Sequence, residues 1–151
     1  TQVTLVPDAE DALTSNAGWN TKKHKEYLKE VISEFNRNGI RTSMLLDPDL
    51  EMVEHEASTG TYRIELYTDA YAIAYSKGNK DAVSIYKDCA VLGHSLGLGI
   101  NAGHDLSMEN IQFFKNNVPH LLEVSIGHAL ISESLYYGLE YVIRDYLQKL
   151  S

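Results

Sequence analysis

The sequence predicts an α/β fold in which parallel strands alternate with helices. Five short runs of β-branched and aliphatic residues are each followed by a longer segment whose apolar residues recur at helical spacing. Strands that alternate with helices pair in parallel through right-handed crossovers. Polar residues or glycine stand at every strand-to-helix junction, where α/β folds concentrate their functional groups. The 151 residues therefore fit one domain, or part of one.

The predicted elements can be placed in order along the chain. Pro7 and Asp8 end the first strand, and a polar loop of residues 8–20 follows, of a length that is often functional. A helix then begins near Thr21 and ends at Asn38-Gly39, because glycine tolerates a left-handed cap. The strands are expected at residues 3–6, 42–46, 63–67, 99–102 and 123–126, and the later helices at residues 48–57, 70–95 (broken at 78–79), 107–116 and 129–150.

Two architectures fit this succession. An open, doubly wound sheet of five strands has the right length, whereas a closed (β/α)8 barrel typically takes about 250 residues. In an open sheet the first and last strands would both be apolar edges, which promote aggregation. That favours a closed barrel with further strands supplied from elsewhere. The chain also begins at Thr1 inside a predicted strand, without an initiator methionine, so we expect an incomplete polypeptide.

Composition and charge exclude several classes of function. Lys and Arg number 13 against 21 Asp and Glu, a formal net charge of −8, so no basic face for nucleic acid or an anionic membrane is expected. No apolar run approaches the roughly 20 residues of a transmembrane helix. Cys89 is the only cysteine and no histidines share metal-binding spacing, so we expect no metal. No secretory signal opens the chain, and we expect a cytoplasmic protein.

Two side chains at or near strand ends could carry proton chemistry. His104 follows a strand directly after Gly103, which permits a close backbone approach, and an imidazole exchanges protons near neutral pH. Glu65 lies inside an apolar strand, where a carboxylate is costly unless it faces a polar site. The plainer alternatives are a histidine that hydrogen-bonds within its loop and a surface carboxylate paired with Arg63.

Two further positions could bind an anion. Gly127 and His128 open the last predicted helix, where free backbone N–H groups can hold a phosphate or an oxyanion. The hydroxyl of Thr14, in the long loop, could bind a substrate phosphate when a lid closes. The alternatives are a helix-start histidine without a ligand and a Thr-Ser pair that only forms a turn.

Four segments of the chain are similar to one family of enzymes. They are Leu5-Val-Pro-Asp8 with Leu13-Thr-Ser15, Arg63-Ile-Glu-Leu-Tyr-Thr-Asp-Ala-Tyr-Ala72, Leu98-Gly-Ile-Asn-Ala-Gly-His-Asp-Leu106 and Glu123-Val-Ser-Ile-Gly-His-Ala-Leu-Ile131. In these segments, and in their order and spacing, the sequence resembles the pyridoxine 5'-phosphate synthase family.

The resemblance implies an α/β fold of the (β/α)8 TIM-barrel type with additional helices. Residues 1–151 would supply about strands four to eight, the C-terminal portion of a single domain, and three N-terminal βα units would be absent. It implies a ring-closing, transferase-type synthase that condenses 1-deoxy-D-xylulose 5-phosphate with 3-amino-2-oxopropyl phosphate, releasing phosphate and water. It implies no metal or organic cofactor and a homo-octamer, to whose contacts Tyr136, Tyr137 and Tyr141 could contribute.

The resemblance also implies roles for individual residues. His104 matches the family's proton donor, and Glu65 matches a carboxylate that stabilises the transition state. Thr14 matches a residue of the mobile loop that binds the deoxyxylulose phosphate. Asp105 and Gly127-His128 match the site for the aminoketone phosphate.

The sequence departs from the family at two places. The family usually has glycine at the position of Asp105, and it usually has Glu-Lys-Arg after Pro7, where this chain reads Asp8-Ala9-Glu10. Both departures change the charge expected near a bound phosphate.

Two other functions stay open at this point. Another phosphate-binding barrel enzyme, such as an isomerase or an aldolase, fits the same junctions, although the predicted strands hold no lysine for a Schiff base. A non-catalytic fragment or assembly module also fits, because the family's general bases lie in the absent N-terminal units. We expect the isolated chain to be inactive for that reason.

Overall fold

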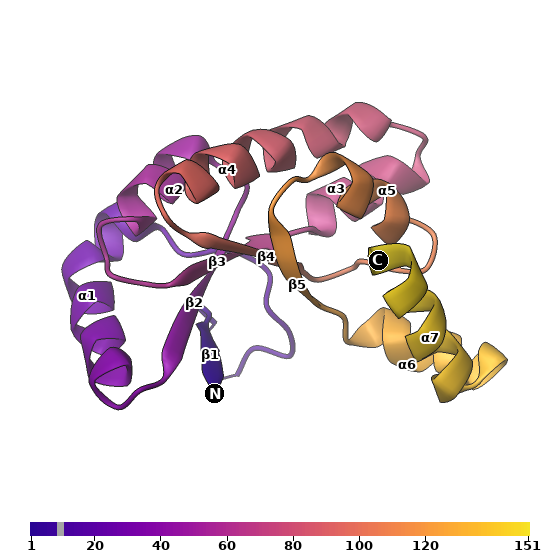
Figure 1. Cartoon of the computed structure of the whole chain (residues 1–151), viewed down its shortest axis with the longest axis horizontal. Coiled ribbons are helices and arrows are strands. Elements are labelled where there is room, and N and C mark those ends of the chain that lie inside the picture. The colour runs from indigo at the N-terminus through magenta and orange to yellow at the C-terminus, as the bar shows by residue number, and fades with distance from the viewer. Residues whose placement is uncertain (9–10) are drawn as a thin grey trace.

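The computed structural model describes residues 1–8 and 11–151 and has an α/β fold with one parallel sheet (Figure 1). The elements, in chain order, are β1 (Gln2–Leu5), α1 (Thr21–Arg37), β2 (Arg41–Leu46), α2 (Leu50–Glu56), β3 (Arg63–Tyr67), α3 (Asp69–Ser76), the 3-10 helix η1 (Lys80–Val83), α4 (Ser84–Ser95), β4 (Gly99–Gly103), α5 (Ile111–Asn117), β5 (Leu121–Ser125), α6 (His128–Tyr137) and α7 (Leu139–Leu150).

The strand order decides between the two predicted architectures. The sheet runs β1-β2-β3-β4-β5, and every neighbouring pair is parallel. A doubly wound sheet reverses its strand order at a switch point, whereas a (β/α)8 barrel adds each new strand beside the last. The sheet is therefore an open arc of barrel type, and the predicted α/β fold is confirmed.

The outer face of the sheet is apolar because helices cover it. Met44 of β2 packs with Leu28 and Ile32 of α1 in a fully buried cluster. A larger cluster joins β2–β5 to helices α2–α5, and its strand residues are Leu46, Ile64, Leu66, Ile100, Ala102 and Leu121. Successive strand side chains point to opposite faces, so the residues between these point inward.

The inner face is polar, and its side chains reach across the sheet. Arg41 of β2 contacts Glu123 of β5 at 3.4 Å, although two strands lie between them. Arg63 of β3 also pairs with Glu123, and its guanidinium donates to Asn101 Oδ1 at 3.1 Å. In a flat sheet β2 and β5 would lie about 14 Å apart, at roughly 4.8 Å per strand. The direct contact fits a concave inner face on which these long side chains converge.

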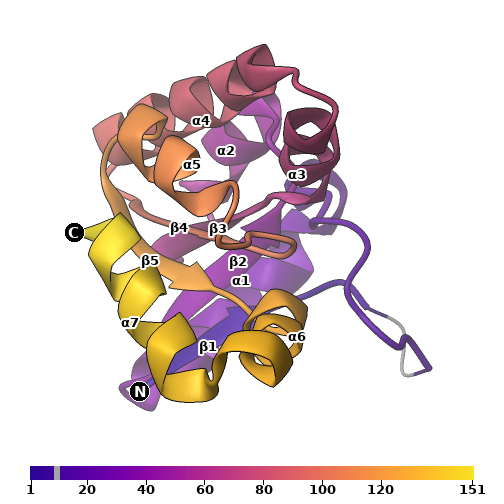
Figure 2. The ribbon, with the colours of Figure 1, turned by 90° about the vertical axis from the view of Figure 1, so that its right-hand side faces the viewer.

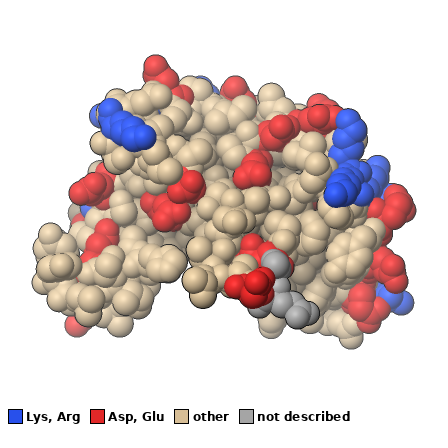
Figure 3. All heavy atoms as spheres, turned by 180° about the vertical axis from the view of Figure 1, so that it is seen from behind, with Lys and Arg blue, Asp and Glu red and all other residues tan. Residues whose placement is uncertain are grey.

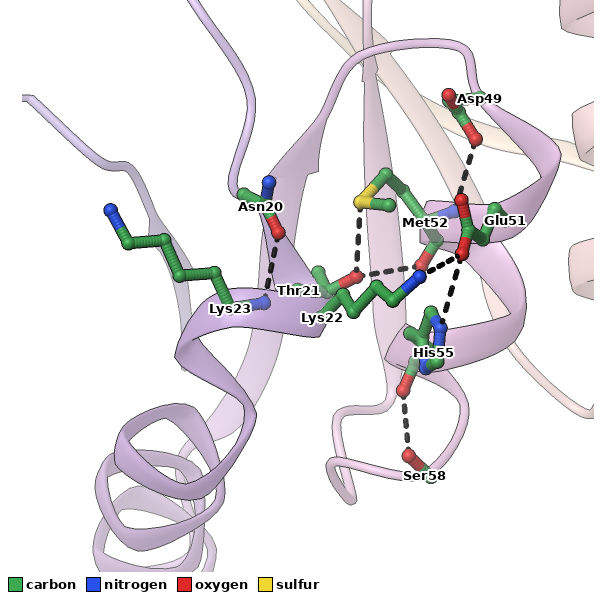
Figure 4. A network of polar contacts seen from close by, with 9 residues as sticks. All are labelled: Asn20, Thr21, Lys22, Lys23, Asp49, Glu51, Met52, His55 and Ser58. Carbon is green, nitrogen blue, oxygen red and sulfur yellow. Dashed lines mark hydrogen bonds and ion pairs between the residues drawn. The ribbon is translucent and has the colours of Figure 1, made fainter.

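Hydrogen bonds and an ion pair at the start of α1 fix the far end of the long loop (Figure 4). The backbone N–H of Trp19 donates to a carbonyl of β2 at 2.8 Å. Asn20 caps α1, its side-chain oxygen accepting a backbone N–H at 2.9 Å. Lys22 then pairs with Glu51 of α2 at 2.6 Å. The segment of the loop before Trp19 is consequently held in place at its exit.

Several predicted boundaries are wrong. The helix expected over residues 107–116 begins only at Ile111. The last strand begins two residues earlier than expected, at Leu121, and ends at Ser125. The predicted helix over residues 129–150 is two helices, because Gly138 takes a φ of 85° that ends α6 and starts a new direction for α7. The predicted break at Gly78 is confirmed, with a φ of 82°. In the described residues, 1–8 and 11–151, no helix has the length and apolar character needed to cross a membrane.

Candidate functional site

A cavity of about 1160 Å³ opens at the carboxyl ends of the strands. Its wall is built from the loop after β1, the ends of β3, β4 and β5, and the first turns of α6 (Figure 2). From behind, the surface is hollowed between the lobe of α6 and α7 and the body of the molecule (Figure 3). The predicted site residues that line the cavity are Thr14, His104, Asp105, Gly127 and His128.

His104 begins the turn that follows β4. Its backbone has a φ of 73°, a left-handed conformation that few non-glycine residues adopt. Its backbone N–H donates to the carbonyl of Ser125 at 3.4 Å, which ties the turn to β5. The ring lies edge-on to that of Tyr67, with centroids 5.0 Å apart. Its Nδ1 is buried and has no hydrogen-bond partner in the described part of the chain, so a group entering the cavity could satisfy it.

Thr68 is a positioning contact that the sequence did not reveal. This buried threonine follows β3 directly, and its one hydroxyl hydrogen is shared between the carbonyls of Gly103, at 2.7 Å, and His104. The Thr68 backbone N–H also donates to the Gly103 carbonyl at 2.9 Å. These bonds hold the backbone on both sides of the left-handed His104 and so set where its imidazole points.

Glu65 lies beneath His104 on the inner face and does not itself line the cavity. Its side chain is 3% exposed, and Oε2 accepts a hydrogen bond from Thr4 of β1 at 3.2 Å. Its other oxygen presses against Gly103, where an added Cβ would collide with it and lie 3.0 Å from the Cβ of Ser125. Glycine is therefore required at position 103 so that a carboxylate can fit below the His104 turn.

Gly127 and His128 form the start of α6, as predicted. Gly127 is the N-cap, and α6 begins at His128, so the first backbone N–H groups of this ten-residue helix are free of intrahelical partners. A Cβ at Gly127 would meet no atom within 4 Å, so packing does not require a glycine there. The open space and the positive end of the helix dipole suit an anion that approaches the backbone closely.

Thr14 lies on the opposite wall of the cavity, in the loop after β1. The loop is folded on itself by Ser15, whose hydroxyl donates to Asp8 at 2.5 Å. Tyr67 donates its phenolic hydrogen to the Ser15 carbonyl at 3.3 Å and so links the loop to the sheet. The sequence departs from the family at Asp8-Ala9-Glu10, and residues 9 and 10 of that segment lie outside the described residues.

Asp105 follows His104 with a φ of 60°, also left-handed. This conformation accounts for glycine at the same place in the resembled family, and aspartate is among the residues that tolerate it. Its carbonyl accepts a hydrogen bond from Asn110 at 3.1 Å. Its carboxylate is exposed and adds negative charge to the rim of the cavity.

The charge around the cavity is acidic. Burial, helped by Asp69 and Asp105, holds the pKa of Tyr67 above its usual range, so its phenol stays protonated at neutral pH. Across residues 1–8 and 11–151, no three His, Cys, Asp or Glu side chains gather as metal ligands would.

The chain matches a family described as "Pyridoxal phosphate biosynthesis protein PdxJ" over residues 1–151. The chain belongs to the PdxJ family. It is 63% identical over 149 residues to a protein of Christiangramia forsetii, 66% identical over 149 residues to one of Flavobacterium johnsoniae, and 53% identical over 149 residues to one of Cytophaga hutchinsonii. Each of these relatives is named pyridoxine 5'-phosphate synthase. The matches cover 99% of this chain and 63% of each relative, so the chain spans under two thirds of their length.

Proposed function

We propose that this chain supplies the C-terminal portion of a pyridoxine 5'-phosphate synthase, about strands four to eight of a single barrel domain. In that proposal, 1-deoxy-D-xylulose 5-phosphate and 3-amino-2-oxopropyl phosphate condense to pyridoxine 5'-phosphate, with release of phosphate and water. The names of the PdxJ relatives support the reaction. The observation that carries the proposal is that His104 and the start of α6 open on the same cavity.

The start of α6 is the proposed site for the aminoketone phosphate. Free N–H groups and the helix dipole there bind a negative charge without a basic side chain, which fits a protein of net charge −8. The hydroxyl of Thr14, across the cavity, would bind the ketose phosphate. The cavity of about 1160 Å³ has room for two small phosphorylated substrates.

His104 and Glu65 are the proposed reactive pair. His104 would donate a proton to a leaving hydroxyl or phosphate during ring closure, a step for which an imidazole is suited near neutral pH. Glu65, buried one layer below, would stabilise cationic imine-like intermediates. The carboxylate already accepts a hydrogen bond from Thr4, which fixes its direction.

Replacing His104 tests the proposal. In the full-length protein, His104→Ala should lower kcat by about 10²- to 10⁴-fold, the usual contribution of a general acid. His94→Ala is the matched control, because His94 is an exposed histidine stacked on His120, away from the cavity. A His104→Ala protein that forms product at the normal rate would refute the assignment of the proton donor.

Further parts of the proposal concern the chain as a whole. The isolated 151 residues should be inactive, because the resembled family's general bases lie in units that this chain lacks; product formed by the purified 151-residue polypeptide would contradict this.

We also propose a transferase-type, cytoplasmic homo-octamer. The most exposed aromatic side chains, Tyr136 at 85% and Tyr137 at 62%, lie on the α6–α7 lobe and could form subunit contacts there. Sedimentation of the full-length protein as a monomer would contradict the octamer.

A further inference from the structure

We propose that Tyr67 is a positioning residue whose ring orients the His104 imidazole and whose hydroxyl holds the Thr14–Ser15 loop over the cavity. It would couple the two walls of the site through a single side chain. Its link to catalysis rests on the proposed function, whereas its link to the loop and to the ring of His104 does not.

The position of Tyr67 follows from the strand. Tyr67 comes two residues after Glu65 in β3, so both side chains point to the inner face, and Tyr67 stands one step nearer the cavity. Its backbone is fixed from the outer side, where the Tyr86 hydroxyl donates to the Tyr67 carbonyl at 3.0 Å. The phenol is therefore presented by a rigid element.

The ring of Tyr67 restricts the imidazole of His104. The two rings pack edge-on, with an interplanar angle of 67° and centroids 5.0 Å apart, a favourable aromatic arrangement. Thr68 fixes the backbone of His104 from the next position in the chain. Residues at the end of β3 thus contact both the backbone and the ring of His104. The side-chain torsions of His104 therefore have little freedom.

The hydroxyl of Tyr67 restricts the loop. Within the described part of the chain, its bond to the Ser15 carbonyl, at 3.3 Å, is the only hydrogen bond between residues 11–17 and the sheet. Those residues form no helix or strand, and the loop is otherwise held by the Ser15–Asp8 bond and by the backbone N–H groups of Gly18 and Trp19 at its exit. Tyr67 would therefore place both the proposed proton donor, His104, and the loop that carries Thr14.

Two substitutions separate the two contacts. Tyr67→Phe removes the hydroxyl and keeps the ring, whereas Tyr67→Leu removes both. Tyr62→Phe is the matched control, because Tyr62 is exposed just before the other end of β3. Each variant is made in the full-length protein, and thermal unfolding monitored by circular dichroism checks that it folds.

Three measurements read the contacts. Amide hydrogen exchange at Gly18 and Trp19, the hydrogen-bonded amides at the end of the loop, reports the loop, and the ring-current shift of the His104 ring protons reports the aromatic contact. Steady-state kinetics with both phosphorylated substrates reports kcat and KM.

We expect Tyr67→Phe to speed exchange at Gly18 and Trp19 by roughly 2- to 12-fold, the effect of one net hydrogen bond. The KM for 1-deoxy-D-xylulose 5-phosphate should rise by a similar factor, with little change in kcat and none in the His104 ring protons. Tyr67→Leu should add the loss of the ring-current shift and a fall in kcat of about 10- to 100-fold, the cost of a misplaced reactive group. Tyr62→Phe should change none of these.

Two outcomes would overturn the inference. One is a Tyr67→Phe protein whose exchange at Gly18 and Trp19 equals that of the unsubstituted protein. The other is a Tyr67→Leu protein whose His104 ring protons, or whose kcat, match those of Tyr67→Phe. If the unsubstituted full-length protein makes no pyridoxine 5'-phosphate, the proposed function fails, and the exchange and ring-proton measurements still decide the placement of loop and ring.

Discussion

The polar groups at the two ends of the sheet's inner face differ in how they are paired. At the amino end, Glu123 is shared between Arg41 and Arg63, and Arg63 also bonds to Asn101, so the charges satisfy one another. At the carboxyl end, His104 keeps a buried nitrogen that has no partner among residues 1–8 and 11–151, beside an open cavity.

The difference separates groups that hold the fold from groups that are available to a ligand. The ion pairs at the amino end join strands that are not neighbours and so support the curvature of the sheet. At the carboxyl end the backbone is strained instead, with two consecutive non-glycine residues in the left-handed region, a feature that clusters at functional sites. Substitutions at the two ends should therefore change different quantities.

The largest effect should come from Gly103→Ala at the carboxyl end. Its Cβ would collide with the carboxylate of Glu65 and displace it from below the His104 turn. We expect kcat of the full-length protein to fall by about 100-fold and the free energy of unfolding to fall by roughly 1–3 kcal/mol.

Gly99→Ala is the matched control at the amino end of the same strand. There the new Cβ would meet flexible side-chain atoms, Arg63 Cγ at 2.9 Å and Leu122 Cδ1 at 3.1 Å. Stability should fall while kcat stays the same. Equal losses of kcat in the two variants would abolish the functional distinction between the ends.

Glu56→Gln should give the next largest effect, and it depends on pH. Glu56 is buried at the end of α2, and burial raises its pKa to about 7, although Thr59 donates a hydrogen bond to it. Because the folded-state pKa lies above the unfolded value of 4.5, the unfolded state releases the proton first. The free energy of unfolding is therefore highest below pH 4.5, and it falls by about 3 kcal/mol in total between pH 4.5 and pH 7.

Urea unfolding at pH 4 and pH 8 checks this expectation. Glu56→Gln should match the unsubstituted protein at pH 4 and exceed it by up to about 3 kcal/mol at pH 8. Glu54→Gln, at an exposed position of the same helix, should leave the pH dependence unchanged. A Glu56→Gln protein with the same pH dependence as the parent would show that this carboxyl is already ionised in the folded protein.

Glu123→Gln should have a smaller effect, confined to stability. It leaves Arg41 and Arg63 without a counter-charge, and Arg63 has a side chain only 15% exposed. Because Glu123 itself is half-exposed, we expect a loss of about 1–2 kcal/mol, below the 3–5 kcal/mol typical of a broken buried pair. The loss should shrink in 1 M salt, and kcat should not change.

Glu140→Gln is the control for this pair, since Glu140 and Arg144 form an exposed ion pair within one helix. Its unfolding midpoint should hardly move. A drop in kcat for Glu123→Gln with stability intact would assign the amino end a part in catalysis.

The smallest effect is expected for Asp105→Gly. Removing a carboxylate from the rim should lower the KM for 3-amino-2-oxopropyl phosphate by about two- to fivefold, as expected for an exposed charge. Asp105→Asn keeps a residue that tolerates the left-handed backbone and removes only the charge, so it should lower KM equally. If only the glycine variant improves KM, backbone strain and not charge limits binding at this position.

Local patterns sufficed to predict most of the fold. Pro7 follows the first strand, Asp47-Pro48 follows the second, and Asn38-Gly39 ends α1. The boundaries of the first units can therefore be predicted from neighbouring residues. The break at Gly138 was missed because the apolar spacing of α6 continues into α7 across it. A glycine in a helical pattern is tolerated, and only its φ of 85° shows that the chain turns there.

The site was predicted less completely, for a physical reason. His104 and Gly127 stand at strand-to-helix junctions, and such positions can be read from the sequence. Tyr67 could also have been found, since its spacing of two from Glu65 puts both on one face of β3. The role of Thr68 could not, because its hydroxyl bonds to carbonyls of a different strand end, 35 and 36 residues away in the chain.

The turn at Gly138 allows α6 and α7 to be held to the rest of the molecule in different ways. α7 docks through Val142 and Tyr146, which pack with Ile111 of α5, whereas α6 has no fully buried residue. α6 is held instead through Glu133, whose carboxylate accepts hydrogen bonds from the Met108 backbone N–H, at 3.0 Å, and from the Tyr146 hydroxyl. A side chain at position 138 would therefore strain the backbone between a helix anchored by apolar packing and a helix anchored through a carboxylate.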